Sequence, residues 1–255
     1  MKTEEAGAKV VALSDKTKSL SEYLEGDEVT LVFKDLGPQI SWTTVFLVEY
    51  AGPIVITLVL WLARKQIYGS NPKLTYNQKL GIAMAIGHYV KRELETLFVH
   101  KFSNDTMPLS NIFKNSFHYF ILFGLFTMYF YLRPDYTPPA WANDNFFSVS
   151  AVLFTIFELL NLKAHMILSS LRKPGTTQRG IPEGWGFGLV SSANYLWEAC
   201  AWTVFCVQAQ VLGGYIFLLA SFYQMAAWAI KKNQRYKKEF PEFPRSRKAM
   251  IPWLL

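Results

Sequence analysis

The stretch TVFLVEYAGPIVITLVLWLAR (residues 44–64) decides the fold class. It is almost wholly apolar and has the roughly 20 residues that an α-helix needs to cross the hydrocarbon core of a bilayer. The sequence therefore predicts an all-α integral membrane protein with about six transmembrane helices. The other five expected spans lie at about residues 79–99, 111–132, 145–169, 187–208 and 211–230.

The composition supports a membrane protein and argues against other classes. The chain has 255 residues, of which 51% are hydrophobic and 16% aromatic, and its net charge is +7. Lys and Arg lie mainly between and after the apolar segments, which is typical of cytosolic loops and contact with anionic lipid. We therefore expect membrane lipid around the protein and no nucleic-acid partner. The two cysteines are too few for a disulfide framework.

Residues 1–42 form a polar N-terminal region without a signal peptide, and the transmembrane domain occupies residues 43–255. We expect disorder over residues 1–28 and a short strand at 27–34. The domain ends in a basic tail. The distribution of Lys and Arg places both termini in the cytosol. The exception is the segment 64–79, whose four basic residues fall on the opposite side.

Ionisable and amide side chains occur within the apolar spans. Each charge costs roughly 2.5–3.5 kcal/mol at the bilayer centre, so such side chains face an interior or a cavity. Two alternatives concern single groups. The charged cluster at 88–95 could lie among lipid headgroups, and the polar residues of the fourth span could serve merely as interhelical hydrogen bonds. Taken together, the four groups predict one polar chamber. They are Glu49, the cluster at 88–95, the one-face stripe Glu158–Asn161–His165, and the i, i+4 pair Asn194 and Glu198 beside Tyr195.

Metal binding is not expected. The four histidines, at positions 88, 100, 118 and 165, include no i, i+4 pair and no HExxH motif. The basic residues in the loop from Arg172 to Gly186 and in the C-terminal tail can serve as topology determinants. Beside a polar chamber they also suit a ligand that carries phosphate groups.

Several longer motifs resemble the steroid 5α-reductase superfamily, and within it the very-long-chain trans-2-enoyl-CoA reductases. The resemblance covers residues 29–255, preceded by only a short remnant of the ubiquitin-like region usual in that family. KDLGPQ, ETLFVH and TMPLSNIFKN are the parts similar to the enoyl-CoA reductases in particular. The motifs are VFKDLGPQISW (32–42), EYAGP (49–53), HYVKRELETLFVHKFS (88–103), TMPLSNIFKN (106–115), LRKPGT (171–176), SSANYLWE (191–198) and RYKKEFPEFPRSRKAMIP (235–252).

The resemblance implies an NADPH-dependent enzyme of the endoplasmic reticulum membrane. It would reduce the double bond of a very-long-chain trans-2-enoyl-CoA, the last step of each fatty acid elongation cycle, which also feeds sphingolipid synthesis. The other elongation enzymes would be its partners.

The resemblance also implies roles for individual residues. Similarity to the steroid reductases makes Tyr89 and Glu49 the pair that polarises the carbonyl. Similarity to the elongation reductases implies that Lys91 and Tyr195 are essential, with Tyr195 as the proton donor. The two resemblances together do not rank Tyr89 against Tyr195. The implied cofactor-binding residues are Asn161, His165, Arg172, Arg179, Asn194, Glu198, Arg235, Tyr236 and Arg247.

Three other functions fit parts of this pattern. A steroid 5α-reductase proper lacks the enoyl-specific motifs, and a membrane methyltransferase lacks SSANYLWE and LRKPGT. A non-catalytic membrane scaffold or a transporter would also have a polar chamber, so the chamber alone does not distinguish it from an enzyme.

Overall fold

The computed structural model describes residues 19–22, 35–102, 105–172 and 180–255. The chain divides into two units, Met1–Gly37 and Pro38–Leu255. In the first unit the described residues include one 3-10 turn, η1 (Leu20–Glu22). The predicted strand at 27–34 and most of the predicted disordered segment lie outside the described residues.

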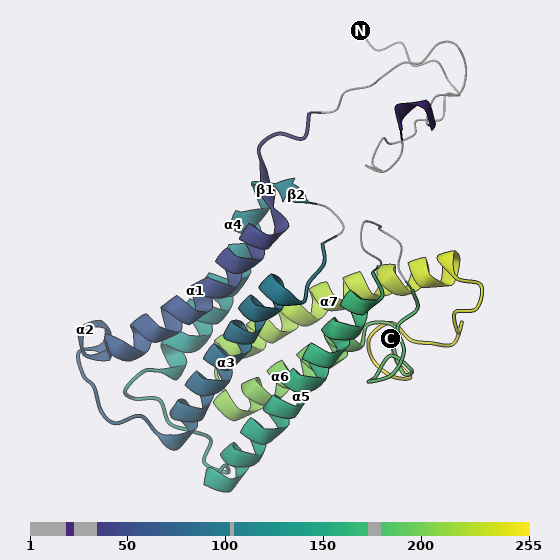
Figure 1. Ribbon diagram of the computed structural model, residues 1–255. Coiled ribbons are helices and arrows are strands. Elements are labelled where there is room, and N and C mark those ends of the chain that lie inside the picture. Colours follow the sequence, from purple (N-terminus) through teal and green to yellow (C-terminus); the bar gives the residue numbers. More distant parts are fainter. Residues whose placement is uncertain (1–18, 23–34, 103–104, 173–179) are drawn as a thin grey trace. The chain divides into compact units, whose positions relative to one another are not determined.

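The second unit is mostly helical, as the sequence predicts. Its two short strands pair antiparallel, with Ile40 opposite Met107. The elements, labelled in Figure 1 except for η2, are β1 (Gln39–Ser41), α1 (Trp42–Leu62), α2 (Arg64–Tyr68), α3 (Tyr76–Phe98), β2 (Thr106–Pro108), α4 (Asn111–Ser116), the π-helical segment η2 (Phe117–Tyr129), α5 (Asp144–Ser170), α6 (Ala193–Ala209) and α7 (Leu212–Glu239).

Three of the described helices, α1, α5 and α7, are long and apolar enough to cross a membrane. The other predicted spans depart from a simple apolar helix in different ways. α3 carries the charged cluster of the second span, the third span is divided between α4 and η2, and α6 has 17 residues. The helical class is thus confirmed, the three candidate spans are consistent with a membrane protein, and the expected number of spans stays a prediction.

Three of the long helices, α1, α3 and α5, begin at side-chain caps that the sequence encodes. Ser41 accepts a hydrogen bond from the Thr44 amide at 3.0 Å and starts α1. Thr75 and Gln78 form a reciprocal capping box at α3, and Asn143 caps α5. Such caps satisfy amide groups that have no partner in the first helical turn.

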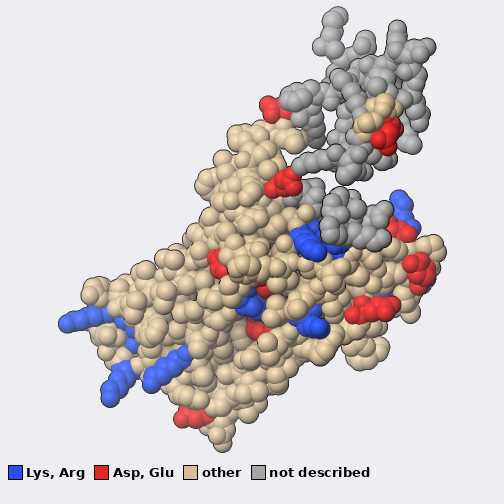
Figure 2. Space-filling model, viewed as in Figure 1, with Lys and Arg blue, Asp and Glu red and all other residues tan. Residues whose placement is uncertain are grey.

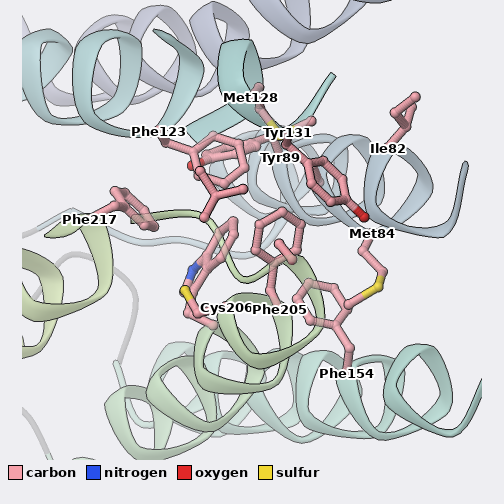
Figure 3. Packing of buried hydrophobic residues seen from close by; sticks show 14 of the residues in the cluster. Ile82, Met84, Tyr89, Phe123, Met128, Tyr131, Phe154, Phe205, Cys206 and Phe217 are labelled. Carbon is pink, nitrogen blue, oxygen red and sulfur yellow. The ribbon is translucent and has the colours of Figure 1, made fainter. Parts of the chain in front are cut away.

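Six helical segments close into a ring in the second unit. α1 packs against α3 and η2, η2 packs against α7, α7 against α6, α6 against α5, and α5 against α3. An aromatic cluster fills part of the interior, and Figure 3 shows its members converging from several helices. Trp202 at its centre lies 4.9 Å from Phe123 and 5.0 Å from Phe217 between ring centroids.

Two helix boundaries differ from those of the predicted spans, and tertiary contacts explain the first. The fifth span was expected from residue 187, but α6 begins at Ala193, because the amides of Ser191 and Ser192 bond to Lys248 and Ala249 instead of to a helix. The sixth was expected to end at 230, but α7 continues to Glu239 through the start of the basic tail.

Charged side chains are sparse over the face seen in Figure 2, where basic atoms gather over α2 and the loop that follows it. Arg64 is not one of the exposed charges, because only 1% of it is accessible. Its guanidinium donates to the carbonyls of Leu132 at 3.1 Å and Pro72 at 2.7 Å, which holds the chain together at this end of the ring.

Candidate functional site

A cavity of about 780 Å³ lies inside the ring, and every helical segment of the ring contributes to its wall. This volume is within the usual range for a site that binds a small molecule or cofactor. Trp202 and Phe217 belong to both the aromatic cluster and the wall. The predicted site residues that line the cavity are Glu49, Asn161, His165, Arg172, Asn194, Tyr195, Glu198 and Tyr236.

One part of the wall combines a carboxylate, a phenol and a guanidinium. Glu49 and Tyr50 are adjacent in α1, and each is 2% exposed. The Arg92 guanidinium of α3 donates to the Tyr50 hydroxyl oxygen at 2.8 Å. It also pairs with Glu95, one turn further along α3. Glu49 Oε2 has no hydrogen-bond partner among the described residues, so this oxygen is available to a ligand.

A network of buried charges lies beside this wall. His88 Nδ1 is 2.9 Å from Glu158 Oε1, and its Nε2 is 3.4 Å from Glu198 Oε1. Lys91 Nζ is 2.7 Å from Glu158 Oε2 and 3.6 Å from Glu95 Oε1. His88, Lys91 and Glu95 of the charged cluster are therefore paired inside the protein, as buried charges usually are, and are not free to contact headgroups.

Asn161 connects α5 to the first turn of α6. Its amide nitrogen donates to the carbonyl of Asn194 at 2.9 Å, and its oxygen accepts from Lys91 at 2.6 Å. Both asparagines are buried, at 0% and 7% exposure. The Asn194 side-chain oxygen has no hydrogen-bond partner in the described part of the chain. Because a buried polar atom without a partner is costly, this oxygen favours a ligand that donates a hydrogen bond.

Basic side chains from four parts of the chain reach the same cavity. Arg172 donates to the backbone carbonyl of Lys101, and Lys101 donates back to the carbonyl of Arg172 at 3.4 Å. Tyr236 is 1% exposed, and its ring stacks on that of Phe243. With two acidic residues on the wall, the surplus of positive charge fits a ligand with several phosphate groups. The basic residues are Arg92, Lys101, Lys114, Arg172 and Lys232.

Four predicted site residues do not line the cavity. Tyr89 is 1% exposed and lies within the aromatic cluster, with Phe123 at 5.1 Å and Trp202 at 5.9 Å between ring centroids. Lys91 lies behind Asn161 and Glu158. Arg235 pairs with Glu239 at 3.6 Å, and Arg247 donates to the carbonyl of Pro182 at 3.4 Å. Arg179 is outside the described residues.

Sequence reasoning did not select Tyr50 and included Arg92 only as a member of the charged cluster at 88–95, with no role of its own, although both lie in motifs that carry the resemblance. The available signal for Tyr50 is its place beside Glu49 in the apolar span. For Arg92 it is the cost of placing a guanidinium within a membrane-spanning helix, because such a charge needs a partner inside the protein. Neither signal tells on its own which way the side chain points.

The spacing of the histidines in the sequence also did not predict that His100 and His165 lie close to Glu95. The ligand atoms of Glu95, His100 and His165 lie within 4.8 Å of one another. The Arg92 guanidinium pairs with Glu95 and lies 3.1 Å from His165 Nδ1. Burial, together with the charges of Arg92 and His165, lowers the pKa of His100 to about 3. Because Arg92 already supplies a positive charge here, the cluster favours an ion-pair network over a metal site.

Known proteins resemble this chain along most of its length. Residues 105–255 match the model of the family described as 3-oxo-5-alpha-steroid 4-dehydrogenase. A Schizosaccharomyces pombe protein, named as a candidate enoyl reductase, is 46% identical over 93% of this chain and 80% of its own. The very-long-chain enoyl-CoA reductase of Dictyostelium discoideum is 40% identical over 96% of this chain and 80% of its own.

This chain belongs to the enoyl-CoA reductase branch of the steroid 5α-reductase superfamily. A human relative, named trans-2,3-enoyl-CoA reductase-like, is 37% identical over 89% of this chain. The family model begins after α3, so it covers the residues of α5, α6 and α7 on the cavity wall but not Glu49, Tyr50 or Arg92. The longer matches extend over those residues as well. The matches to enoyl-CoA reductases therefore include the cavity-wall residues of α1 and α3 as well as those of α5, α6 and α7.

Proposed function

We propose that this protein reduces the trans-2 double bond of a very-long-chain enoyl-CoA with NADPH, as the last step of fatty acid elongation. The proposal is supported above all by the cavity, which combines basic side chains with a buried carboxylate and tyrosines. The relatives' names add support for an acyl-CoA substrate. The product would also enter sphingolipid synthesis.

The residues on the wall fit a nicotinamide dinucleotide. Arg172 would hold phosphate groups, with Lys232 nearby on α7. The unpartnered oxygen of Asn194 suits the donor of a carboxamide, and Glu198 suits a ribose hydroxyl. When bound, a reduced nicotinamide supplies the hydride to Cβ. Asn161, His165 and Tyr236 also line the wall and complete the proposed set. Arg235 and Arg247 lie outside the wall and would act on phosphate groups only from a greater distance.

Negative charge develops on the thioester oxygen when Cβ is reduced, and a hydrogen-bond donor there lowers the barrier. Cα then needs a proton, which a positioned acid can deliver. Tyr195 lines the cavity from the first turn of α6, so we assign it the proton donor's role. Glu49 would keep the polar end of the substrate in place through its free oxygen. Tyr89, buried behind the wall, would contribute only through its neighbours.

The membrane setting suits this substrate. A long acyl chain is stabilised by about 0.8 kcal/mol for each CH₂ group that stays in an apolar environment. An enzyme whose cavity lies within the bilayer need not pull the tail into water. We propose that all six ring segments span the endoplasmic reticulum membrane, with both termini in the cytosol beside the CoA head group. Other elongation enzymes would then hand over their product within the membrane.

The test is an assay of the purified full chain with NADPH and trans-2-hexadecenoyl-CoA. We expect NADPH oxidation that depends on the enoyl-CoA and yields saturated acyl-CoA, identified by mass spectrometry. The family model's description favours one second candidate, reduction of a 3-oxo-Δ4 steroid. Turnover of the steroid with none of the enoyl-CoA would overturn the proposal, and turnover of neither would favour a non-catalytic role.

A further inference from the structure

The hydroxyl group of Tyr50 is bonded through its oxygen, while its proton remains available to a ligand. Its oxygen accepts a hydrogen bond from Arg92 Nη2 at 2.8 Å, and the guanidinium carbon lies 5.0 Å from the Tyr50 ring centroid. No described residue accepts the hydroxyl proton of Tyr50. Because Tyr50 lines the cavity, this proton is the part of the side chain left for a ligand.

Arg92 is fixed in the position from which it contacts Tyr50. Its Nη1 pairs with Glu95 and lies 3.1 Å from His165 Nδ1, so three polar groups hold the two ends of the guanidinium. Glu95 is 1% exposed and also lies 3.6 Å from Lys91 Nζ. A planar guanidinium with several partners loses little further freedom and orients the groups it binds.

A phenol that accepts a hydrogen bond from a cation becomes a stronger hydrogen-bond donor. The charge of Arg92 draws electron density from the Tyr50 oxygen, and bonds in such a chain reinforce one another at low dielectric. The ring is held in place by Tyr119, edge-on at 5.4 Å, and by Phe46 at 5.6 Å between centroids. Tyr50 is therefore a strengthened, fixed donor on the cavity wall.

Tyr89 lacks two of these properties, the hydrogen bond from a cation and the place on the cavity wall. Its hydroxyl has no hydrogen-bond partner among the described residues. Its ring is packed edge-on against His88 at 4.8 Å, inside the aromatic cluster shown in Figure 3. Tyr89 is not among the residues that line the cavity, and no described cation donates a hydrogen bond to its hydroxyl as Arg92 does to that of Tyr50.

We infer that Tyr50 is the hydrogen-bond donor to the thioester oxygen of the enoyl substrate and that Arg92 is its positioning residue. This inference rests on the proposed function. A hydride adds to Cβ, the π electrons move to the Cα–C bond, and the carbonyl electrons move to the oxygen that Tyr50 contacts. Protonation at Cα then restores the carbonyl. Tyr50 keeps its proton throughout, and one hydride and one proton are consumed.

The first test is Tyr50→Phe, which removes the hydroxyl and keeps the ring. Loss of one oxyanion donor lowers kcat by roughly 10²–10³-fold. We expect a loss of this size with the dissociation constant for NADPH unchanged. Tyr68→Phe is the matched control, because its hydroxyl donates to the Tyr129 carbonyl at 2.8 Å away from the cavity. It reports what the loss of a tyrosine hydroxyl does to stability alone.

The second test needs no turnover. An aryl-substituted trans-2-enoyl-CoA with an electron-donating ring absorbs at longer wavelength when its carbonyl is polarised. We expect a red shift on binding to the wild-type protein without NADPH, and most of that shift to be lost in Tyr50→Phe. Arg92→Lys, which keeps a positive charge beside Glu95, should lose part of the shift and lower kcat more than it changes KM. This second variant decides the matter if Tyr50→Phe does not fold.

Three results separate the two proposals. A wild-type protein that does not reduce enoyl-CoA defeats the proposed function. A wild-type protein that does so, while Tyr50→Phe keeps both turnover and red shift, defeats only the assignment of Tyr50. Loss of turnover and red shift in Tyr89→Phe, with Tyr50→Phe unaffected, would return the role to Tyr89.

Discussion

At the scale of single residues, Lys91 shows how a side chain outside the cavity can control it. Its ammonium joins Glu158 and Asn161, and Asn161 in turn bonds to the carbonyl of Asn194. Lys91 therefore fixes the Asn161 side chain on the cavity wall and, through it, the backbone of Asn194, without lining the cavity itself. We regard it as a positioning residue.

Lys91→Met should weaken NADPH binding and lower the thermal midpoint. It keeps the apolar stem but removes one partner of a buried pair, which typically costs about 3–5 kcal/mol. Lys91→Arg should restore part of both properties. Lys163→Met, on the exposed side of α5, is the control. Fluorescence titration with NADPH and thermal unfolding in detergent give the two readouts. If Lys91→Met bound NADPH normally and lost only turnover, Lys91 would be catalytic instead.

At the scale of elements, the contact between η2 and α7 brings two backbones together without side chains between them. A Cβ on Gly213 would lie 2.0 Å from the carbonyl oxygen of Phe126, which no side-chain rotation can relieve. The neighbouring Gly214 has room, because a Cβ there would meet Cys206 Sγ and Thr127 Cγ2 at 3.4 Å. η2 also places His118 and Tyr119 on the cavity wall, so this contact shapes the site.

Gly213→Ala should separate η2 from α7 and prevent normal folding or lower the thermal midpoint strongly. Gly214→Ala should be tolerated, because Ala favours a helix over Gly by up to about 1 kcal/mol and meets only ordinary contacts. Expression in membranes and thermal unfolding of the purified variants measure the difference. Equal behaviour of the two variants would show that η2 and α7 are not packed as described.

At the scale of the whole molecule, the C-terminal segment fastens the beginning of α6. The amides of Ser191 and Ser192 donate to the carbonyls of Lys248 and Ala249 at 2.9 and 3.0 Å. Met250 is 0% exposed and packs with Ala199 and Met225. The last residues of the chain thus hold the turn from which Asn194 and Tyr195 project.

Met250→Ser should destabilise the protein by about 2–5 kcal/mol, as expected for truncating a buried methionine, and should also weaken NADPH binding. Leu254→Ser, at a position 77% exposed, serves as the control and should be close to neutral. Thermal unfolding with and without NADPH measures both effects. A loss of stability with unaltered NADPH affinity would mean that this segment supports the fold but not the site.

Much of the fold follows from the sequence. The structure helps to explain the basic residues that disagree with the predicted orientation in the membrane. Four basic residues at 64–79 opposed the predicted orientation, yet Arg64 is buried and binds backbone carbonyls. The exposed exceptions are reduced to Lys65, Lys73 and Lys79. The late start of α6 was not predictable, because it depends on hydrogen bonds to residues 248 and 249, which are distant in the sequence.

The sequence by itself determined the helical membrane class, the polar stripe of Glu158, Asn161 and His165, and the convergence of several helices on one chamber. These follow from local quantities, namely the length of apolar runs, the 3.6-residue period and the cost of burying charge. Only the tertiary structure decided that Tyr50 and not Tyr89 faces the cavity. Successive side chains on a helix point about 100° apart, and their surroundings depend on how neighbouring helices are rotated and packed.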